Sequence, residues 1–452
     1  MRPASPLASG EERHVGLDEL FFSTTDRRGI IKTGNSVFMR ISRYHAEELI
    51  GAPHSVVRHP AMPAGAFRLM WDRLLSGRPM AAYVDNLAKD GASYRVFATV
   101  TPLGEDFLSV RMAPAGPLAS AATALYAGVR AFEGNLARTQ QLSGPEVAAA
   151  GAQQIERELA RLGFEDYDDF MLAALPTEVA ARGSVLARAF TRTHTTGPLG
   201  DILATTTRVN ERLDHLVERL GGYRGLIEQL GPATDTVYQQ ASSLQRSVEA
   251  ALQASAEVAA TTPVLLNVAR VMRQPMGSAV EALRALSLEL TALRHEVADL
   301  GFRIALARLH TEMVRAFTVE VIDGQAPPSS LAEVPRLCQA VHAGVLAMGQ
   351  AIEDVNHSLT TVSLQIRDAG ALMRDFRNFL GQWRILTVRH RQAAAVADHL
   401  GPIDLQLDSM ADHLDFLESL AVHCHGSVAP FDRLALDPDL NRITALLGYS
   451  PV

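Results

Sequence analysis

The chain has 452 residues, of which 47% are hydrophobic and 20% charged, and its formal net charge is −8 at pH 7. This composition predicts a folded protein of two or three structural units and argues against a nucleic-acid partner, which would require a basic surface. The two cysteines, Cys338 and Cys424, are too few for a disulfide framework, and neither a signal peptide nor an apolar run of membrane-spanning length is visible. We therefore expect a cytoplasmic protein without a membrane span.

The first 115 residues divide into a predicted flexible tail, residues 1–16, and a mixed α+β region, residues 17–115. In the second region, short alternating apolar runs bounded by turn residues indicate strands, and apolar spacings of three and four indicate helices. The predicted strands are 21–23, 29–33, 80–86, 94–102 and 106–112, and the predicted helices are 35–50 and 64–75. A small antiparallel sheet with helices on one face fits this order.

The segment Pro53–Pro63 reads P-H-S-V-V-R-H-P-A-M-P and joins the two predicted helices. Its prolines remove amide donors and restrict the residues before them to extended geometry. We therefore predict a stiff cationic loop, and its Arg58 and His59 suit an anionic or planar aromatic ligand. A solvated loop stiffened by prolines is the alternative interpretation.

The order of elements resembles a PAS domain, and three segments make the resemblance more specific. They are F-F-S-T-T-D-R-R-G-I-I from Phe21, G-N-S-V-F-M-R-I-S-R-Y-H-A-E-E-L-I-G-A-P-H-S-V-V-R-H-P-A-M-P from Gly34, and W-D-R-L-L-S-G-R-P from Trp71. Together they resemble the sensor domain of bacterial aerotaxis receptors, over about residues 20–114. The resemblance implies a domain that binds FAD non-covalently and reports the redox state of the cell.

The same resemblance implies a set of residues in or beside the flavin pocket: Asn35, Arg58, His59, Trp71, Asn86 and Tyr94. The sequence departs from the family at Ala61, where an aspartate is usual, and at Met80, where a tryptophan is usual. The residue types leave alternatives open. Arg58 could pair with a phosphate or form a surface ion pair, and His59 could bond a flavin edge, ligate haem iron or bond its own loop.

Residues 116–230 change to a composition rich in Ala, Leu, Glu and Arg, and we predict a helical connector. Residues 231–426 carry two heptad seams separated by a turn near 323–330. The first seam consists of Val237, Leu244, Ala251, Val258, Leu265, Met272, Ala279, Leu286, Leu293, Leu300, Ala307, Val314 and Val321, and the second of Val334, Val341, Met348, Val355, Val362, Ala369, Phe376 and Trp383. Two such seams predict a long antiparallel coiled-coil hairpin, with Pro263 and Pro275 bending its first arm.

A lone hairpin would leave apolar surface uncovered, so the sequence favours a homodimer in which two hairpins form a four-helix bundle. A hairpin after a PAS domain resembles the signalling region of methyl-accepting chemotaxis receptors, with Glu312 and Arg315 matching the tip helix. Ala326-Pro327-Pro328 replaces the usual kinase-contact residues there. Residues 427–452 are predicted to be a C-terminal tail.

The sequence thus predicts an α+β PAS sensor followed by an all-α region, and three functions stay open. The first is a redox or oxygen sensor that binds FAD and signals through a dimeric bundle to an unidentified downstream protein. The second is a haem-based gas sensor using His59 or His54, and the third is a scaffold with a degenerate PAS domain. No catalytic motif or metal-ligand set is found, so we do not expect an enzyme.

Overall fold

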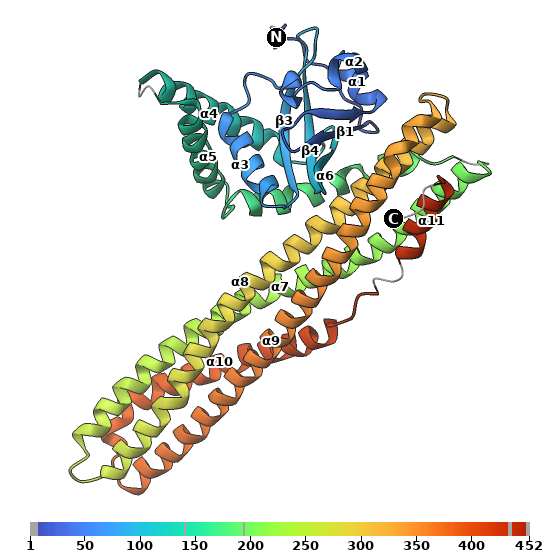
Figure 1. Cartoon of the computed structure of the whole chain (residues 1–452). Coiled ribbons are helices and arrows are strands. Elements are labelled where there is room, and N and C mark those ends of the chain that lie inside the picture. The colour runs from blue at the N-terminus through green and yellow to red at the C-terminus, as the bar shows by residue number, and fades with distance from the viewer. Residues whose placement is uncertain (1–7, 140–141, 193–194, 433–435, 449–452) are drawn as a thin grey trace. The chain divides into compact units, whose positions relative to one another are not determined.

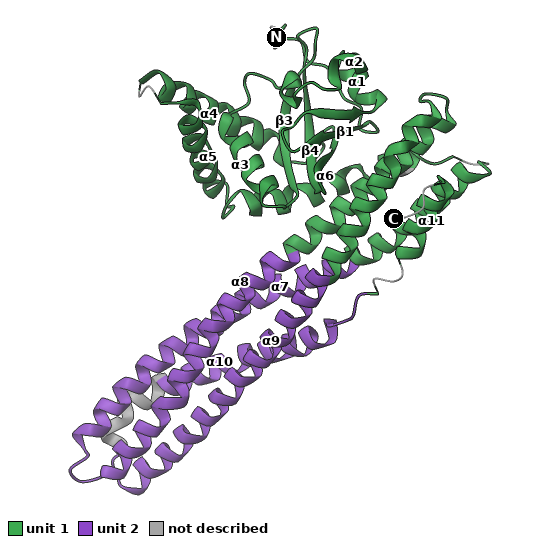
Figure 2. Cartoon of the chain, viewed as in Figure 1, with its two compact units in different colours: residues 1–217, 298–349, 432–452 green, residues 218–297, 350–431 purple. Residues whose placement is uncertain are grey.

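The computed structural model describes residues 8–139, 142–192, 195–432 and 436–448. The chain divides into two compact units (Figure 2). Unit 1 comprises residues 1–217, 298–349 and 432–452, and unit 2 comprises residues 218–297 and 350–431.

Unit 1 begins with an antiparallel sheet in the strand order β2-β1-β5-β4-β3. Its strands are β1 (Leu20–Asp26), β2 (Ile31–Gly34), β3 (Met80–Leu87), β4 (Ser93–Leu103) and β5 (Asp106–Met112). All five predicted strands are present. Successive side chains of a strand point to opposite faces of a sheet, so the alternating sequence pattern indicated them correctly. With helices packed on the sheet, this is the PAS-type α+β fold that the resemblance implied.

Four short elements lie between β2 and β3: α1 (Ser36–Ser42), α2 (Ala46–Leu49), the one-turn 3-10 helix η1 (His54–Val57) and α3 (Ala64–Leu75). The predicted helix 64–75 is confirmed, whereas the single helix predicted over 35–50 is wrong. Arg43 ends α1 in the left-handed conformation, at φ 61°. His45 then starts α2 in a capping box with Glu48.

The predicted flexibility of residues 8–16 is also wrong. Arg13 holds this segment to the sheet and to α1. Its amide donates to the Ser93 carbonyl of β4 at 2.7 Å, and its guanidinium donates to the Ile41 carbonyl of α1 at 2.8 Å. The side chain of Val15 is buried. Residues 1–7 lie outside the described part of the chain.

Beyond β5 the chain forms α4 (Leu118–Thr139), α5 (Gly144–Arg161) and α6 (Tyr167–Ala189). Figure 1 shows α3, α4 and α5 beside the sheet. Pro176 lies inside α6. The outer face of the sheet shares one core with α6 and with residues 298–349, and Phe22 of β1 meets Phe317 edge-to-face with ring centroids 5.2 Å apart.

The predicted continuous first arm is instead two helices, α7 (Pro198–Glu257) and α8 (Pro263–Ile322). Residues 258–262 form a turn, and Pro263 is the first residue of α8, where a missing amide donor costs little. The two helices are antiparallel, because Glu249 pairs with Arg273 in unit 2 and Asp214 pairs with Arg308 in unit 1. The heptad pattern continues unchanged through this turn, so the sequence did not indicate that the chain reverses direction between α7 and α8.

Unit 2 is a four-helix bundle formed by one chain. The parts of α7 and α8 in unit 2 pack with α9 (Val334–Arg389) and α10 (Ala393–Ser427). Helix α10 contacts both α9 and α7: Arg374 of α9 pairs with Glu418 of α10, and Gln240 of α7 donates to Ser409 of α10. The residues of both seams are buried within one chain, except Val258 and Val321. The expectation that a single chain leaves the seams exposed, on which the predicted four-helix bundle of two hairpins rested, is therefore wrong.

The turn predicted near 323–330 is present, with the 3-10 helix η2 (Pro328–Glu333) leading into α9. The last helix, α11 (Asp437–Leu446), belongs to unit 1. Its Asp439 pairs with Arg208 at 2.9 Å and with Arg212 at 3.0 Å, which anchors this part of the C-terminal segment to α7.

Candidate functional site

A cavity of about 340 Å³ lies within the PAS domain, between the inner face of the sheet, α3 and the loop that contains η1. Its α3 wall is apolar and aromatic, and its loop and β5 walls carry arginine, histidine and amide groups. The lining residues are Thr25, Arg28, Gly29, Pro53, His54, Ser55, Arg58, Phe67, Met70, Trp71, Leu74, Val84, Asn86, Ala98, Val100, Phe107, Ser109 and Arg111. This lining set contains no aspartate or glutamate, so the cavity suits a largely apolar, planar ligand with negative charge.

Arg111 of β5 is a buried cation in this wall, with only 6% of its surface exposed. Its Nη2 donates to Nε2 of His54 at 2.5 Å and to Oγ of Ser23 at 3.0 Å, and within the described residues its Nη1 has no hydrogen-bond partner. Burial lowers the pKa of Arg111 to about 10, so the group remains charged at neutral pH. A buried charge without a counter-ion is unfavourable, and an anionic group in the cavity would relieve that cost.

His54 of η1 supports this arginine from the loop. Desolvation and the charge of Arg111 hold the pKa of His54 well below its ordinary value, so the ring is neutral and its Nε2 accepts from the guanidinium. The ring also stacks on Phe38, with centroids 5.8 Å apart and an interplanar angle of 8°. Because Nε2 is engaged, it is not free to ligate a metal in this conformation.

Arg58, predicted from the loop motif, lies in the cavity wall above Phe67 of α3. Its guanidinium carbon is 3.7 Å from the ring centroid, a cation–π contact. Burial lowers the pKa of Arg58, and the attraction of Glu133 partly offsets that effect. Arg58 forms no recorded salt bridge within the described residues, so this second cation also faces the cavity without a bound counter-ion.

Trp71 and Asn86, which the resemblance placed in or beside a flavin pocket, line this cavity. Trp71 contributes an indole from α3 and packs edge-to-face on Phe107, with centroids 5.8 Å apart. Asn86 of β3 is 4% exposed, and its side-chain amide has no hydrogen-bond partner recorded among the described residues. An amide of this kind can donate to and accept from a ring edge.

Asn35, His59 and Tyr94 are not among the lining residues. Asn35 joins β1 to α1, since its Oδ1 accepts from the amides of Phe22 and Phe38. His59 bonds its own loop, with Nδ1 accepting from the Ala61 amide at 3.1 Å. Tyr94 is a core residue stacked on Phe21. The structure thus brings three of the six predicted residues to the cavity.

Sequence analysis did not assign Arg111 or Phe67 to the site. Alternation along β5 contains the necessary signal, because Phe107, Ser109 and Arg111 share a face while Leu108 and Val110 occupy the other. An arginine on the inward face of a strand is unusual enough to indicate a ligand, and the sequence resemblance did not point to it.

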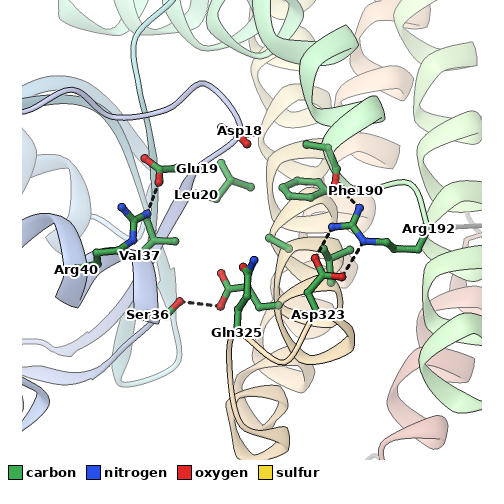
Figure 3. A pocket seen from close by; sticks show the side chains of 14 residues that line it. Asp18, Glu19, Leu20, Ser36, Val37, Arg40, Phe190, Arg192, Asp323 and Gln325 are labelled. Atoms are coloured by element: carbon green, nitrogen blue, oxygen red, sulfur yellow. Dashed lines mark hydrogen bonds and ion pairs between the residues drawn. The ribbon is translucent and has the colours of Figure 1, made fainter. Parts of the chain in front are cut away.

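A second, more open cavity of about 770 Å³ lies in unit 1 beside α1, α6 and the end of α8. Figure 3 shows several of its polar side chains paired with one another. Arg192 pairs with Asp323 at 2.5 Å, and Ser36 Oγ donates to Glu320 at 2.9 Å. These contacts connect the PAS domain and the segment after α6 to the end of α8. Arg192 is paired with a carboxylate here, in contrast to Arg111 and Arg58 of the first cavity.

The fold and the first cavity define a PAS-type domain. A comparison with curated proteins agrees: the chain is 33% identical over 131 residues to the aerotaxis receptor of Escherichia coli strain K12. The match covers 28% of this chain and 26% of the receptor, so the chain matches about a quarter of that relative's length. The matched part of the chain is therefore similar to an aerotaxis receptor.

Among solved structures, the light state of the blue-light photoreceptor Aureochrome1 LOV is 15% identical, with a TM-score of 0.22 over 23% of this chain and 88% of that one. The Rhodobacter sphaeroides LOV protein is 16% identical, with a TM-score of 0.21 over 32% and 89% of the two chains. No family model matches the sequence. None of the helices described is both long and apolar enough to span a bilayer, and no metal-binding cluster of His, Cys, Asp or Glu is found among the residues described.

Proposed function

We propose that this protein is a signal-transduction protein whose PAS domain binds a flavin, FAD in the first instance, and thereby senses redox state or oxygen. The observation that supports the proposal is Arg111, a buried cation in an aromatic cavity that has no carboxylate partner among the described residues. A flavin ring is planar and gains electrons, and often negative charge, on reduction, and nearby protein charges tune that chemistry. The similarity to an aerotaxis receptor supports the same ligand class.

The groups in the cavity fit a flavin ring in kind and number. Trp71 and Phe67 provide aromatic surface, Asn86 provides a free amide, and Arg111 and Arg58 provide positive charge. The volume, about 340 Å³, is at the lower end of the range for ligand pockets. We therefore expect the cavity to hold the ring system, with the phosphate-bearing part extending toward solvent.

Two alternatives are less well supported. The haem alternative assigns a histidine ligand, but Nε2 of His54 is engaged by Arg111 and the ring of His59 does not line the cavity. A scaffold with an empty PAS domain would have no reason to keep unpaired cations in its core. Because the matched relative is a receptor, the proposal assigns sensing and no catalytic reaction.

The absorbance spectrum of the purified protein, before and after incubation with FAD and removal of free ligand, separates these alternatives. Flavin bands that co-purify with the protein are the expected result. A Soret band would favour the haem sensor, and a colourless protein after incubation with FAD and with haem would favour the scaffold.

For assembly, we propose that each chain completes its own bundle, because Leu244, Leu286 and Val355 of the seams are fully buried within one chain. The homodimer expected from the sequence would then form through surfaces other than these seams. Light scattering on the purified protein measures the mass of the assembly against the 48.8 kDa chain.

A further inference from the structure

Helix α3 begins without a side-chain cap of its own, since its N-cap residue is Pro63. Its first amides are bound instead by Glu133 of α4. Oε2 of Glu133 accepts from the Ala64 amide at 2.9 Å, and Oε1 accepts from the Gly65 amide at 2.8 Å. The Glu133 side chain is fully buried, so this carboxylate serves as the cap and complements the positive end of the helix dipole.

Two glycines let the three helices approach this carboxylate. A Cβ on Gly65 would overlap the backbone of α5 at Gly151, and a Cβ on Gly151 would overlap Oε1 of Glu133. Helix α3 packs against α5, and α4 packs against α5. The start of α3 is therefore fixed to the α4–α5 pair by close backbone packing and by two charge-assisted hydrogen bonds.

The opposite side of α3 forms the aromatic wall of the cavity through Phe67 and Trp71. The loop wall is held from α4 as well, because Nε of Arg130 donates to the Pro60 carbonyl at 3.2 Å and Glu133 attracts Arg58. The α3 wall and the loop wall of the cavity are thus both held by one turn of α4, which follows the PAS sheet in sequence.

We propose that Glu133 is a positioning residue of the ligand cavity, through which ligand binding and the docking of α4–α5 on α3 influence each other. This inference rests on the proposed function for its ligand. Coupling of this kind is reciprocal: if docking of α4 improves affinity for the ligand, the ligand stabilises that docking by the same factor. The cavity would then report its occupancy to α4, the helix through which the chain leaves the sensor domain.

The test compares Glu133→Gln with Glu146→Gln in the full chain. Glu146 is a matched control, because it forms the capping box of α5 with Ser143 and does not line the cavity. We expect Glu133→Gln to weaken FAD binding, measured by flavin fluorescence, about fivefold, the factor that corresponds to a typical cap interaction. It should also abolish the FAD-dependent change in hydrogen exchange over residues 118–161, whereas Glu146→Gln preserves both properties.

Gly151→Ala perturbs the same contact from α5 and should shift affinity in the same direction as Glu133→Gln. Wild-type affinity and a wild-type exchange response in Glu133→Gln would overturn the inference.

A second readout needs no flavin. The chain has two tryptophans, Trp71 in the cavity wall and the fully buried Trp383 of unit 2, so acrylamide quenching reports mainly on Trp71.

In the ligand-free protein, quenching of Trp71 should rise in Glu133→Gln and stay unchanged in Glu146→Gln. If wild-type protein binds no FAD but Trp71 responds in this way, the proposed function is wrong and the positioning role of Glu133 stands. If Trp71 does not respond, and affinity is also unchanged or absent, the positioning role is wrong.

Discussion

The phenol of Tyr83 on β3 donates a 2.7 Å hydrogen bond to Oε1 of Glu178 on α6. The other oxygen of Glu178 accepts from the Ala115 amide at 2.6 Å, immediately after the last strand of the sheet. Arg182, one turn further along α6, donates to the Ala113 carbonyl at 3.1 Å. Helix α6 therefore holds the segment through which the chain leaves the PAS domain, and a change in the sheet would reach the helical region here.

The first prediction concerns this contact. Tyr83→Phe should lower the free energy of unfolding of the full chain by about 1–3 kcal/mol, because it leaves one oxygen of a buried carboxylate without a donor. Urea unfolding followed by circular dichroism measures the change. Tyr94→Phe is the control, since the buried Tyr94 hydroxyl has no hydrogen-bond partner among the described residues and its removal should be neutral or slightly stabilising. Equal losses in both variants would show that the Tyr83–Glu178 bond adds nothing.

The second prediction concerns pH and His310 of α8, which lies 3.5 Å from the Thr101 hydroxyl of β4. Burial lowers the pKa of His310 to about 4, against an ordinary value of 6.5. Between these two values the unfolded chain binds a proton that the folded chain does not, so stability is complete above pH 6.5 and falls as the pH drops toward 4. The loss from this residue should reach about 3 kcal/mol, and His310→Gln should remove it.

The measurement is the free energy of unfolding at several pH values for wild type and His310→Gln. His54 has a lowered pKa as well and contributes in the same direction, so only the difference between the two proteins reports on His310. Parallel pH profiles would contradict the prediction.

Sequence patterns predicted the PAS sheet and α3 well because those elements follow local rules: alternation for the strands, spacing of three and four for the helix, and prolines around it. The reversal between α7 and α8 was not predicted, because the heptad spacing is the same on both sides of Val258–Thr262 and only tertiary contacts show the change of direction. Arg43 was also unexpected, since nothing local marks an arginine for the left-handed region.

The candidate site was predicted in part for a related reason. The family resemblance pointed to Arg58, Trp71 and Asn86, which line the cavity. It pointed equally to Asn35, but the Asn35 side chain forms its hydrogen bonds with the backbone of β1 and α1. Arg111 lies outside the motif, and its importance depends on its burial and on a cavity lining that contains no carboxylate. Those properties depend on the folded structure and not on the sequence around the residue.

The third prediction concerns the bundle. Replacing both Leu290 and Leu293 of α8 with Asp should unfold unit 2, at a cost above about 4 kcal/mol, because each change buries an unpaired charge. Loss of helical signal in circular dichroism measures this. In the wild type, the midpoint of thermal unfolding should be independent of protein concentration, because one chain supplies all four helices. A midpoint that rises with concentration would show that a second copy stabilises the bundle.

The central claim is that Arg111 provides the buried charge that selects the ligand, and replacing it with methionine tests the claim most directly. The comparison is the FAD dissociation constant and the ligand-free unfolding free energy of wild type, Arg111→Met and the control Arg95→Met. Arg95 lies outside the cavity and is paired with Asp85 at 2.6 Å. Arg111→Met should weaken FAD binding at least about tenfold, the factor for one charge-assisted hydrogen bond, while leaving the ligand-free protein as stable as wild type or more so. Arg95→Met should keep wild-type affinity. Wild-type protein that binds no FAD, or an Arg111→Met variant that binds it as tightly as wild type, would contradict the account.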